Sequence, residues 1–496
     1  MPEQGLVSAA HPLAAKAGKT MLTDHHGNAI DAAIATAFAL GVVDPGNSGI
    51  GGYGGMAVIY LAEEKKVQVV DFNTKLPLMA AAGNLEPPAQ RKTGYKAISV
   101  PGVVSGLHMM HKHFGSVDWK NLISPSIKLA KEGITINQTL EEMLREPHIK
   151  NFPHTVHEFF DQNQKPLKKG DRLTRPDLAN TLEAISLHGP HIFYEGQIGQ
   201  TIVDDIQNNG GYLSMEDLTS YRPALKEPIN IHYKGYDIFG PPDYSGSFTM
   251  MQTLMLLKDA ELPPNRSSPM IHTVAKAMGR AWKDRRQVRG DKKSVLHLLK
   301  ENTMNPLLES GPIHSKPTDQ QGHTTHVSTA DSKGNLVALT LTHGPLWFGS
   351  GITIPGTGIV MNNGMVLFRS KGHEALTNLT PTIVLHEDNP FLTIGTPGAT
   401  KIITLVTTSL IDLIDFQVSI KEALSQTRFH FEGDCLYIED DIPAYARMEL
   451  ETIGYRVKPL KRSDYYGPAT GIKVTKTENG YLFESAVDPR FEGGYY

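Results

Sequence analysis

Apolar and polar positions repeat with two different periods along this chain. Between residues 29 and 43 the apolar positions recur at helical spacing, and Asn28 can cap the helix that this pattern predicts. Residues 116–310 are predicted to be mainly helical, with one β segment at 229–240. From Thr324 onward the period changes to two, which predicts an antiparallel strand pair at 326–331 and 335–342.

A second strand pair is predicted at 381–387 and 389–395, followed by an apolar helix over 402–414. Antiparallel strands in groups, with helices before and after them, favour a layered arrangement of sheets with helices on the outside. The sequence contains neither a repeat of fixed period nor a low-complexity linker between two halves. The pattern therefore predicts a layered sandwich of helices and sheets.

The composition is that of an ordinary soluble globular protein. Of the 496 residues, 40% are hydrophobic and 20% charged, and the formal net charge of −4 gives no reason to expect nucleic acid or anionic lipid as a partner. The single cysteine, Cys435, excludes an internal disulfide framework. The N-terminal residues lack the pattern of a secretory signal, and the apolar run 29–43 contains Asp31 and is too short for a membrane span. We expect a cytoplasmic protein without a membrane segment.

No cofactor or metal site is expected. The glycines of residues 49–54 match G-x-G-x-x-G, but here a helix precedes them and a strand follows, which is the reverse of the order in dinucleotide-binding proteins. They are more typical of a tight backbone path. The adjacent pair His25-His26 and the three histidines of residues 108–113 lack a cluster of partners with metal-ligand spacing. The motifs H-E-x-x-H and G-x-S-x-G are absent from the sequence.

Thr324 is the strongest candidate for chemistry. It follows Gly322 and His323 and opens the first alternating strand. A hydroxyl in this position can cut its own chain and then, as a new N-terminal residue, attack substrate amides. Threonine also favours strands for structural reasons alone. The residues around Thr324 must therefore decide between these two interpretations.

Ordered sequence blocks over nearly the whole chain favour the catalytic interpretation of Thr324. They are similar to blocks of the gamma-glutamyltransferase family of N-terminal nucleophile hydrolases, and they lie at residues 9–55, 97–115, 176–196, 210–221, 240–247, 324–342, 348–363, 381–385, 395–403, 428–430 and 488–490. The resemblance implies an α+β fold, a four-layer αββα sandwich that spans residues 1–496 as a single domain. It also implies self-cleavage between His323 and Thr324 into a large chain, 1–323, and a small chain, 324–496, which stay intertwined.

The resemblance assigns roles to the reacting groups. Thr324 would be the nucleophile, and its freed α-amine, with an ordinary pKa near 8, would be the base. Thr342 matches a second threonine that supports the nucleophile by hydrogen bonding. The backbone amides of Gly398 and Ala399 match the oxyanion donors of the family. Ala399 replaces a family glycine, and we expect its amide to keep this role provided that its φ is not positive.

The substrate-binding positions depart from the family pattern. The arginine that holds the glutamyl α-carboxylate is replaced by Asn73, with Lys75 two residues on as a partial substitute. Beside the α-ammonium, the acidic or amide residue after Asn362-Asn363 and the aspartate that follows it are replaced by Gly364 and Leu367. The family asparagine after the second threonine falls at Gly344 or the adjacent Pro345, and the family serine pair falls at Thr377 and Asn378.

We therefore expect a self-processing amidohydrolase or acyltransferase that acts on a small amide or peptide and passes the acyl group to water or an amine. The acyl group is expected to differ from ordinary γ-glutamyl, since charge-reading positions are lost. Two alternatives remain open. One is an ordinary glutathione hydrolase with a substitute clamp, such as Lys75 or Arg369. The other is an unprocessed family member that acts as a binding or scaffold protein.

Overall fold

Two sheets of this protein face one another, and helices cover the outer face of each. The computed structural model describes residues 4–83, 85–242, 245–287, 299, 312, 323–368, 377–461 and 467–496. The first sheet has seven strands in the order β20-β1-β9-β10-β2-β3-β6. Their bounds are β20 Gly494–Tyr495, β1 Gly5–Ala9, β9 His323–Asp331, β10 Leu336–Gly344, β2 Gly54–Leu61, β3 Lys66–Asp71 and β6 Ala224–Lys226.

The second sheet has six strands in the order β19-β18-β14-β13-β8-β7, and every neighbouring pair in it is antiparallel. Their bounds are β19 Gly480–Val487, β18 Thr470–Thr477, β14 Asn389–Gly395, β13 Thr382–His386, β8 Tyr236–Gly240 and β7 Ile229–Tyr233. In both sheets, strands from before residue 323 lie beside strands from after it: β1 pairs with β9 and with β20, β10 pairs with β2, and β13 pairs with β8.

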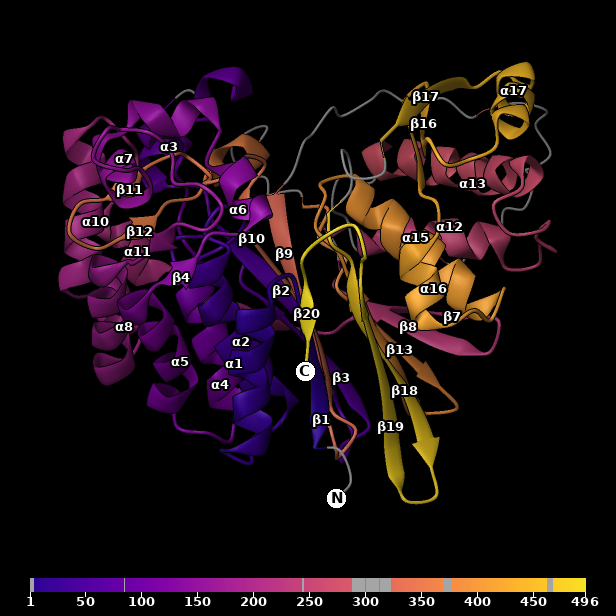
Figure 1. Cartoon of the computed structure of the whole chain (residues 1–496), viewed down its shortest axis with the longest axis horizontal. Helices are drawn as coiled ribbons and strands as arrows, with labels where there is room; N and C mark the ends of the chain where they lie inside the picture. The colour runs from indigo at the N-terminus through magenta and orange to yellow at the C-terminus, as the bar shows by residue number, and fades with distance from the viewer. Residues whose placement is uncertain are drawn as a thin grey trace.

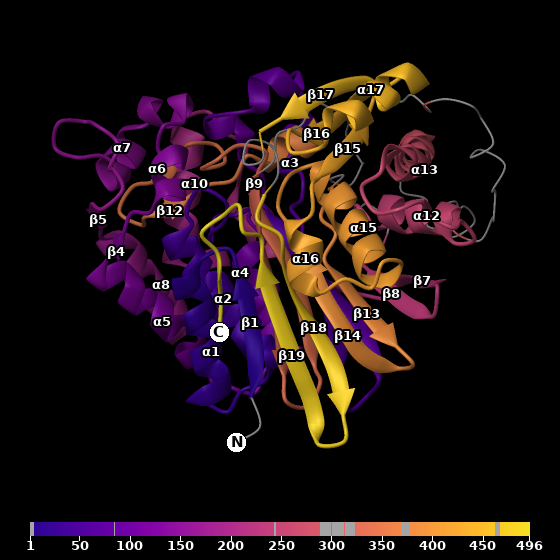
Figure 2. The ribbon, with the colours of Figure 1, turned by 45° about the vertical axis from the view of Figure 1, so that its right-hand side comes forward.

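Helices form the two outer layers (Figure 1). The layer on the seven-stranded sheet contains α1 Pro12–Thr23, α2 Ala29–Val43, α4 Val103–Phe114, α5 Trp119–Glu132 and α8 Pro176–His188. The layer on the six-stranded sheet contains α12 Ser247–Leu257, α13 Ser268–Gln287, α15 Lys401–Ile414 and α16 Ile420–Ser425. Figure 2 shows the long β18–β19 hairpin in front of the first sheet, with α16 and α15 above it. The predicted four-layer αββα sandwich is confirmed.

Smaller elements surround these layers. On the side of the first sheet they are α3 Leu78–Ala82, α6 Gln138–Met143, α7 Pro153–Phe159, α9 His191–Tyr194, α10 Gln197–Asn208, α11 Met215–Ser220, the strands β4 Ile134–Thr135, β5 Arg172–Leu173, β11 Thr353–Ile354 and β12 Ile359–Val360, and the 3-10 turns η1 Pro88–Arg91, η2 Tyr95–Ala97, η3 Pro147–Asn151 and η5 Gly364–Leu367. Beyond α15 lie β15 Phe429–Glu432, β16 Cys435–Glu439, β17 Arg456–Leu460 and α17 Ala444–Ile453.

The local sequence explains why α2 forms where it was predicted. The Asn28 side chain accepts from the backbone N–H groups of Ile30 and Asp31, and the Asp31 carboxylate accepts from the backbone N–H of Asn28 at 3.0 Å. This reciprocal capping satisfies donors that a helix start leaves free. Asp44 ends the helix as its C-cap. The β segment predicted at 229–240, within the mainly helical region, is the β7–β8 hairpin.

The predicted strand pair that begins near Thr324 is β9 and β10, and both strands are buried on both faces. Val327 packs in the core under the helices, whereas Ser328 donates to the carbonyl of Thr393 in the opposite sheet at 3.3 Å. Alternate residues of β9 therefore face the helices and the second sheet. Since Thr324 is in phase with Ser328, it belongs to the face between the sheets.

Three apolar cores hold the layers together. One lies between the first sheet and its helices, and a second lies between the other sheet and its helices. The third lies between the two sheets and includes Val58, Ala338, Ile383 and Ile472. In the described part of the chain, no helix is long and apolar enough to cross a membrane.

Candidate active site

Thr324 lies opposite a β-bulge at the beginning of β9. Thr325 pairs with Leu341 and His323 pairs with Gly344, so two residues, Thr342 and His343, stand across from Thr324 alone. A bulge of this kind twists the strands locally and redirects side chains. Thr324 itself is 4% exposed. The irregularity thus falls at the residue to which the sequence assigned the chemistry.

Thr342 contacts the peptide group that precedes Thr324. Its hydroxyl donates to the carbonyl oxygen of His323 at 2.6 Å and accepts from the N–H of Gly344 at 2.8 Å. The sequence predicted a hydrogen bond that supports the nucleophile. In the continuous chain the donor is instead directed at the carbonyl of the expected cleavage site. The bulge explains this, because it brings the Thr342 side chain level with residue 323.

The His323 ring packs on Trp347, with 4.2 Å between ring centroids. Desolvation lowers the pKa of His323 to about 4, with a smaller opposing effect of the Glu146 charge. The ring is therefore neutral at neutral pH.

The loop between β14 and α15 carries the two expected oxyanion donors. Gly398 has φ +128° and Ala399 has φ +52°. The φ at Ala399 is therefore positive, contrary to the expected condition, and the backbone has the left-handed shape that glycine adopts easily. The case for the Ala399 amide as a donor rests instead on its N–H group. Among the described residues, the N–H groups of Gly398 and Ala399 donate to no partner. They lie at the N-terminal end of α15, which favours negative charge.

This loop is placed over the nucleophile strand from two sides. Gly395, at the end of β14, lies against the His326 ring, where an added Cβ would meet the ring at 2.3 Å. His326 is two residues from Thr324, and its ring nitrogens contact Thr340 Oγ1 at 2.7 Å and Ser328 Oγ at 3.1 Å. Burial lowers the pKa of His326 to about 3, so it acts as a neutral hydrogen-bonding spacer between the sheets.

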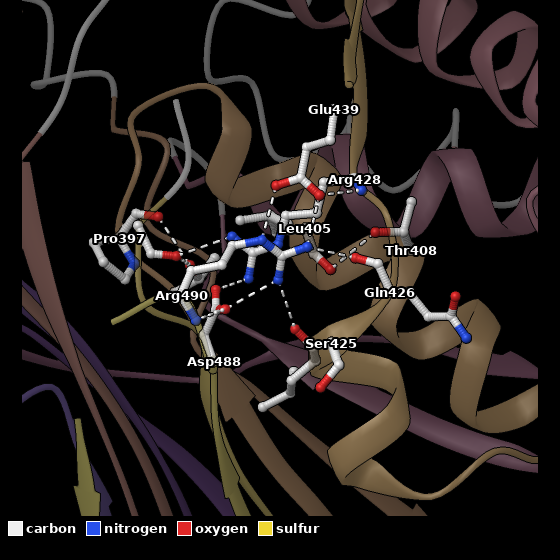
Figure 3. A network of polar contacts seen from close by, with 12 residues as sticks. Pro397, Leu405, Thr408, Ser425, Gln426, Arg428, Glu439, Asp488 and Arg490 are labelled. Atoms are coloured by element: carbon white, nitrogen blue, oxygen red, sulfur yellow. Dashed lines mark hydrogen bonds and ion pairs between the residues drawn. The ribbon is translucent and has the colours of Figure 1, made fainter. Parts of the chain in front are cut away.

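A buried ionic network supports the other side of the loop (Figure 3). Arg490 bonds Glu439 at 2.6 Å and Asp488 at 3.0 Å, and Asp488 also pairs with Arg428. The Arg428 guanidinium donates to the carbonyl of Gly467 at 3.2 Å. Thr396 Oγ1 donates to that same carbonyl at 3.3 Å, and Pro397 packs on Gly467. The arginines of the 428–430 and 488–490 blocks therefore fix the segment that leads to Gly398.

A turn after α2 supports the bulge from the helix side. Asn47 Nδ2 donates to the Asp44 carboxyl at 2.9 Å, and the Asn47 carbonyl accepts from the N–H of His343 at 3.0 Å. Burial raises the pKa of Asp44 to about 7, against smaller opposite effects of Asn47 and Thr325. Neither Asp44 nor His343 was assigned to the site from the sequence. Only the fold brings them behind Thr324.

His343 is buried against Gly49, and burial lowers its pKa to about 3. With Arg175 it lines a small cavity that has room for about one water molecule. The glycines of residues 49–54 lie in this region, and Gly49 lines the cavity. A Cβ added at Gly51 would meet the Val360 carbonyl at 2.3 Å, so the backbone passes close to its neighbour there. The predicted tight backbone path is confirmed.

The Asn73 side chain is bonded to a neighbouring residue, and the Lys75 side chain is exposed. The Asn73 Nδ2 group donates to Asp71 Oδ1 at 3.0 Å, so the donor expected to replace the family arginine is already used. Its Oδ1 is buried and has no partner among the described residues. The Lys75 side chain is exposed. Asp71 in turn pairs with Lys226 at 2.7 Å.

The Asn363 side chain occupies the space into which a side chain at position 344 would point. Gly344 has φ +130°, and a Cβ added there would lie 2.0 Å from Asn363 Oδ1. A side chain at position 344 would therefore collide with the Asn363 carboxamide. Asn363 is fully buried and donates from Nδ2 to the Lys92 carbonyl at 3.0 Å, while its Oδ1 has no partner among the described residues.

Gly364 has no room for the acidic or amide side chain of the family. A Cβ there would lie 2.2 Å from Ser99 Oγ and 2.9 Å from Tyr53 Cβ. Ser99 Oγ is held by the Asn362 side chain at 2.8 Å. Leu367, three residues on, packs in a small apolar cluster with Ala80, Met365, Phe368, Leu76, Leu85 and Tyr212. The surroundings are thus built for an apolar segment.

Thr377 and Asn378, which match the serine pair, are held by a buried arginine that the sequence did not single out. Arg285 donates to the Thr377 carbonyl at 2.7 Å and to Asn378 Oδ1 at 3.2 Å. The Thr377 hydroxyl lies 3.5 Å from Tyr53 Oη. Thr377 therefore borders the same region as Gly364, through Tyr53. Arg369, the other suggested clamp, lies outside the described residues.

The histidines of α4 have packing roles. His111 Nε2 lies 2.9 Å from the Val117 carbonyl, and the His108 and His111 rings pack on Trp119 at 5.2 and 5.4 Å. No group of three metal-ligating side chains occurs in the described ranges.

Comparison with known proteins identifies the family of this chain. The family model described as Gamma-glutamyltranspeptidase matches residues 14–496. The chain belongs to the gamma-glutamyltranspeptidase family. The family consists of hydrolases and transferases, and the predicted resemblance is thereby confirmed.

Relatives within the family carry two kinds of name. The glutathione hydrolase proenzyme of Bacillus subtilis (strain 168) is 32% identical, over 92% of this chain and 85% of its own length. The acylase ACY 1 proenzyme of Pseudomonas sp. (strain SE83) is also 32% identical, over 92% of this chain and 87% of its own. The crystal structure of cephalosporin acylase from Bacillus halodurans matches with a TM-score of 0.88 at 25% identity, covering 100% of this chain and 96% of that one.

Proposed function

We propose that this gamma-glutamyltranspeptidase-family chain is a proenzyme that cleaves itself between His323 and Thr324. The observation that carries the proposal is the hydrogen bond from the Thr342 hydroxyl to the His323 carbonyl, opposite the bulge at Thr324. A donor aimed at this oxygen stabilises the negative charge that develops on it when a nucleophile attacks the carbonyl carbon. The proenzyme names of the two relatives agree with such a step.

In this step Thr324 Oγ1 attacks the His323 carbonyl carbon and the peptide C–N bond breaks. The nitrogen takes up a proton and becomes the α-amine of Thr324, and an ester joins Oγ1 to the His323 acyl group. Water then hydrolyses the ester. The products are a carboxylate at His323 and a free hydroxyl on Thr324. The α-amine is thereby released as a base next to the hydroxyl.

The mature site would cleave substrate amides by the same chemistry. An α-amine with an ordinary pKa near 8 is partly neutral at neutral pH and can take the Thr324 hydroxyl proton. The unpartnered N–H groups of Gly398 and Ala399, at the start of α15, are suited to the substrate oxyanion. The acyl group then passes from Thr324 to water or to an amine.

We propose further that the acyl group is not ordinary γ-glutamyl. Gly364 has no space for an acid, Leu367 packs in an apolar cluster, and the Asn73 amide is bonded to Asp71. A zwitterionic head would lose solvent without gaining partners there, which costs several kcal/mol. Relatives named as acylase and as glutathione hydrolase are equally similar in sequence, so identity alone does not select the substrate.

A denaturing gel with intact mass measurement tests self-cleavage. Purified wild type is expected to give two chains with the masses of residues 1–323 and 324–496, and Thr324→Ala one chain. Thr325→Ala is the matched control, because its hydroxyl faces the helices, and it should still be cleaved. A single band for wild type would contradict self-cleavage and favour a binding or scaffold protein.

Anilide substrates test the acyl preference of the processed protein. Rates are compared for γ-glutamyl, dicarboxyl and apolar acyl anilides. We expect γ-glutamyl to be the poorest of the three. A strong γ-glutamyl preference would instead favour an ordinary glutathione hydrolase, and Lys75→Met would then show whether the exposed Lys75 supplies the clamp.

A further inference from the structure

A buried guanidinium lies directly behind the acyl-binding positions. Arg91, the last residue of η1, is 1% exposed. Its Nε donates to the Glu86 carbonyl at 2.7 Å, and its two terminal nitrogens donate to the carbonyls of Met365 and Phe368, the latter at 3.1 Å. All three acceptors are neutral main-chain oxygens. Arg91 makes no ion pair with any described residue.

These contacts join two distant segments of the chain. Met365 and Phe368 are separated from Arg91 by 274 and 277 positions, and they directly follow Gly364 and Leu367. Arg91 therefore holds the turn that carries both positions at which the family has its ammonium-binding side chains. The neighbouring Asn363 donates to the carbonyl of Lys92, which reinforces the same junction.

Among the described residues, no carboxylate forms an ion pair with Arg91, although the Glu86 charge acts on it from a distance. Glu86, the nearest carboxylate along its segment, is paired with Lys96 at 2.7 Å. Residues 359–368 contain no Asp or Glu, and neither do residues 72–82. Asp71, which precedes the second of these stretches, is paired with Lys226. Gly364 and Leu367 match the family positions that receive a substrate ammonium, and in this chain the turn that carries them is bonded to a buried cation.

We propose that Arg91 is a specificity-determining residue that selects acyl groups without an α-ammonium. It does so by holding the η5 turn and by imposing a positive potential on the acyl subsite. The preferred substrates are amides of dicarboxylic acids whose far carboxylate benefits from this potential. This inference rests on the proposed function. Two like charges in one partly buried site repel each other, so the Arg91 guanidinium should disfavour an acyl group that carries an ammonium by about tenfold.

Two anilides that differ only in the α-ammonium provide the test. The kcat/KM values for glutaryl p-nitroanilide and γ-glutamyl p-nitroanilide are measured for processed wild type, Arg91→Lys and Arg91→Met. Wild type is expected to prefer glutaryl. Arg91→Met should reduce the glutaryl to γ-glutamyl ratio about tenfold, whereas Arg91→Lys should keep the ratio within about threefold, with both rates lowered because a lysine cannot reach all three carbonyls.

Lys92→Met is the matched control, since it removes an exposed cation next to Arg91 and leaves Glu86 paired with Lys96. It should leave the ratio unchanged. Leu367→Asp tests the charge without touching Arg91: an acid in the turn should shift the ratio toward γ-glutamyl, also if the Arg91 variants fail to fold. The thermal midpoint and the extent of self-cleavage are recorded for each variant.

The outcomes separate this inference from the function on which it rests. If wild type hydrolyses neither anilide, the proposed function fails and the inference fails with it. If wild type prefers γ-glutamyl, the inference alone is overturned. If Arg91→Met lowers both kcat/KM values by one common factor, or if Leu367→Asp leaves the ratio unchanged, Arg91 has only a structural role and the inference is likewise overturned.

Discussion

The hydroxyl of Thr342 donates a 2.6 Å hydrogen bond to the carbonyl oxygen of His323, the residue directly before Thr324. This hydroxyl is itself held by the N–H of Gly344, which donates to it at 2.8 Å. The donor is thus fixed in direction before any bond is cut. A preorganised donor of this kind is the arrangement that lowers the barrier to attack on a carbonyl.

Thr342→Ala is therefore expected to slow self-cleavage. Loss of one oxyanion donor raises a barrier by about 3 kcal/mol, which corresponds to roughly a hundredfold in rate. Thr342→Ser keeps the hydroxyl and should retain most of the rate. Appearance of the 324–496 chain is followed on denaturing gels. Thr329→Ala, which removes a hydroxyl bonded to the Ala29 carbonyl on the helix side of the same strand, is the control and should be processed normally.

Ala399→Gly is expected to stabilise the protein. Ala399 holds φ +52°, a conformation that costs a residue with a Cβ about 1 kcal/mol more than glycine. The free energy of unfolding should rise by up to this amount, measured by urea denaturation, and activity should be kept because the amide direction is unchanged. Ala184→Gly within α8 should have the opposite sign. Destabilisation by Ala399→Gly would show that the left-handed backbone stores no strain.

Gly364→Asp would place the family acid at its expected position, but it is expected to harm the fold rather than restore γ-glutamyl binding. The new Cβ would meet Ser99 Oγ at 2.2 Å and Tyr53 Cβ at 2.9 Å. Overpacking of this kind costs about 1–3 kcal/mol. Thermal unfolding should show a lower midpoint, while Gly83→Asp, at a site with only one atom at 3.6 Å, should change it little. A variant with an unchanged midpoint and gained γ-glutamyl hydrolysis would refute this.

Asp44→Asn is expected to change how stability depends on pH. Burial raises the pKa of the Asp44 carboxyl from 3.8 to about 7, so between these pH values the folded protein keeps a proton that the unfolded chain has released. Folding therefore takes up a proton in this window, and the free energy of unfolding falls as pH rises, by up to about 1.4 kcal/mol per unit. Above about pH 7 this contribution is constant.

Asparagine does not titrate, so the stability of Asp44→Asn relative to wild type should increase from about pH 4 to about pH 7 and then level off. Urea denaturation across this range measures the difference. Glu64→Gln, at an exposed position, serves as the control with a flat difference. A flat difference for Asp44→Asn as well would contradict the raised pKa.

Asp488→Ala is expected to destabilise the protein strongly. It removes the Asp488 carboxylate that pairs with the buried Arg428, and it deprives Arg490 of one of its two carboxylate contacts, Asp488 and Glu439. Removing one member of a buried ion pair costs about 3–5 kcal/mol. The exposed pair Arg456–Asp434, tested by Asp434→Ala, should cost less than about 1 kcal/mol. Equal effects of the two variants on the unfolding midpoint would show that the network in Figure 3 does not anchor the loop before Gly398.

Local signals were sufficient for several elements. Asn28 and Asp31 predicted the start of α2, because a capping box depends on residues three positions apart. The alternating pattern after Thr324 predicted β9 and β10, which a short turn connects. The four layers followed from the resemblance, since ordered blocks constrain the whole chain at once.

Other parts of the site depend on contacts between distant residues and could not be predicted from the sequence. Nothing near Arg91 in the sequence indicates that its partners are carbonyls more than 270 positions away. The positive φ of Ala399 was not predicted, because alanine by itself disfavours it. Matching by position also could not show that the Asn363 carboxamide occupies the space beside Gly344, since Gly344 ends β10 and Asn363 lies in the segment before η5.

The mixing of early and late strands in both sheets has a thermodynamic consequence. In the first sheet β1 lies between β9 and β20, and β10 pairs with β2, so a cut at His323 leaves two chains that complete each other's hydrogen bonding. Before the cut, unfolding yields one molecule; after it, unfolding yields two. The melting temperature of the processed protein should then rise with protein concentration, while that of uncleaved Thr324→Ala stays constant. By cutting itself, the chain would turn an intramolecular fold into an assembly equilibrium.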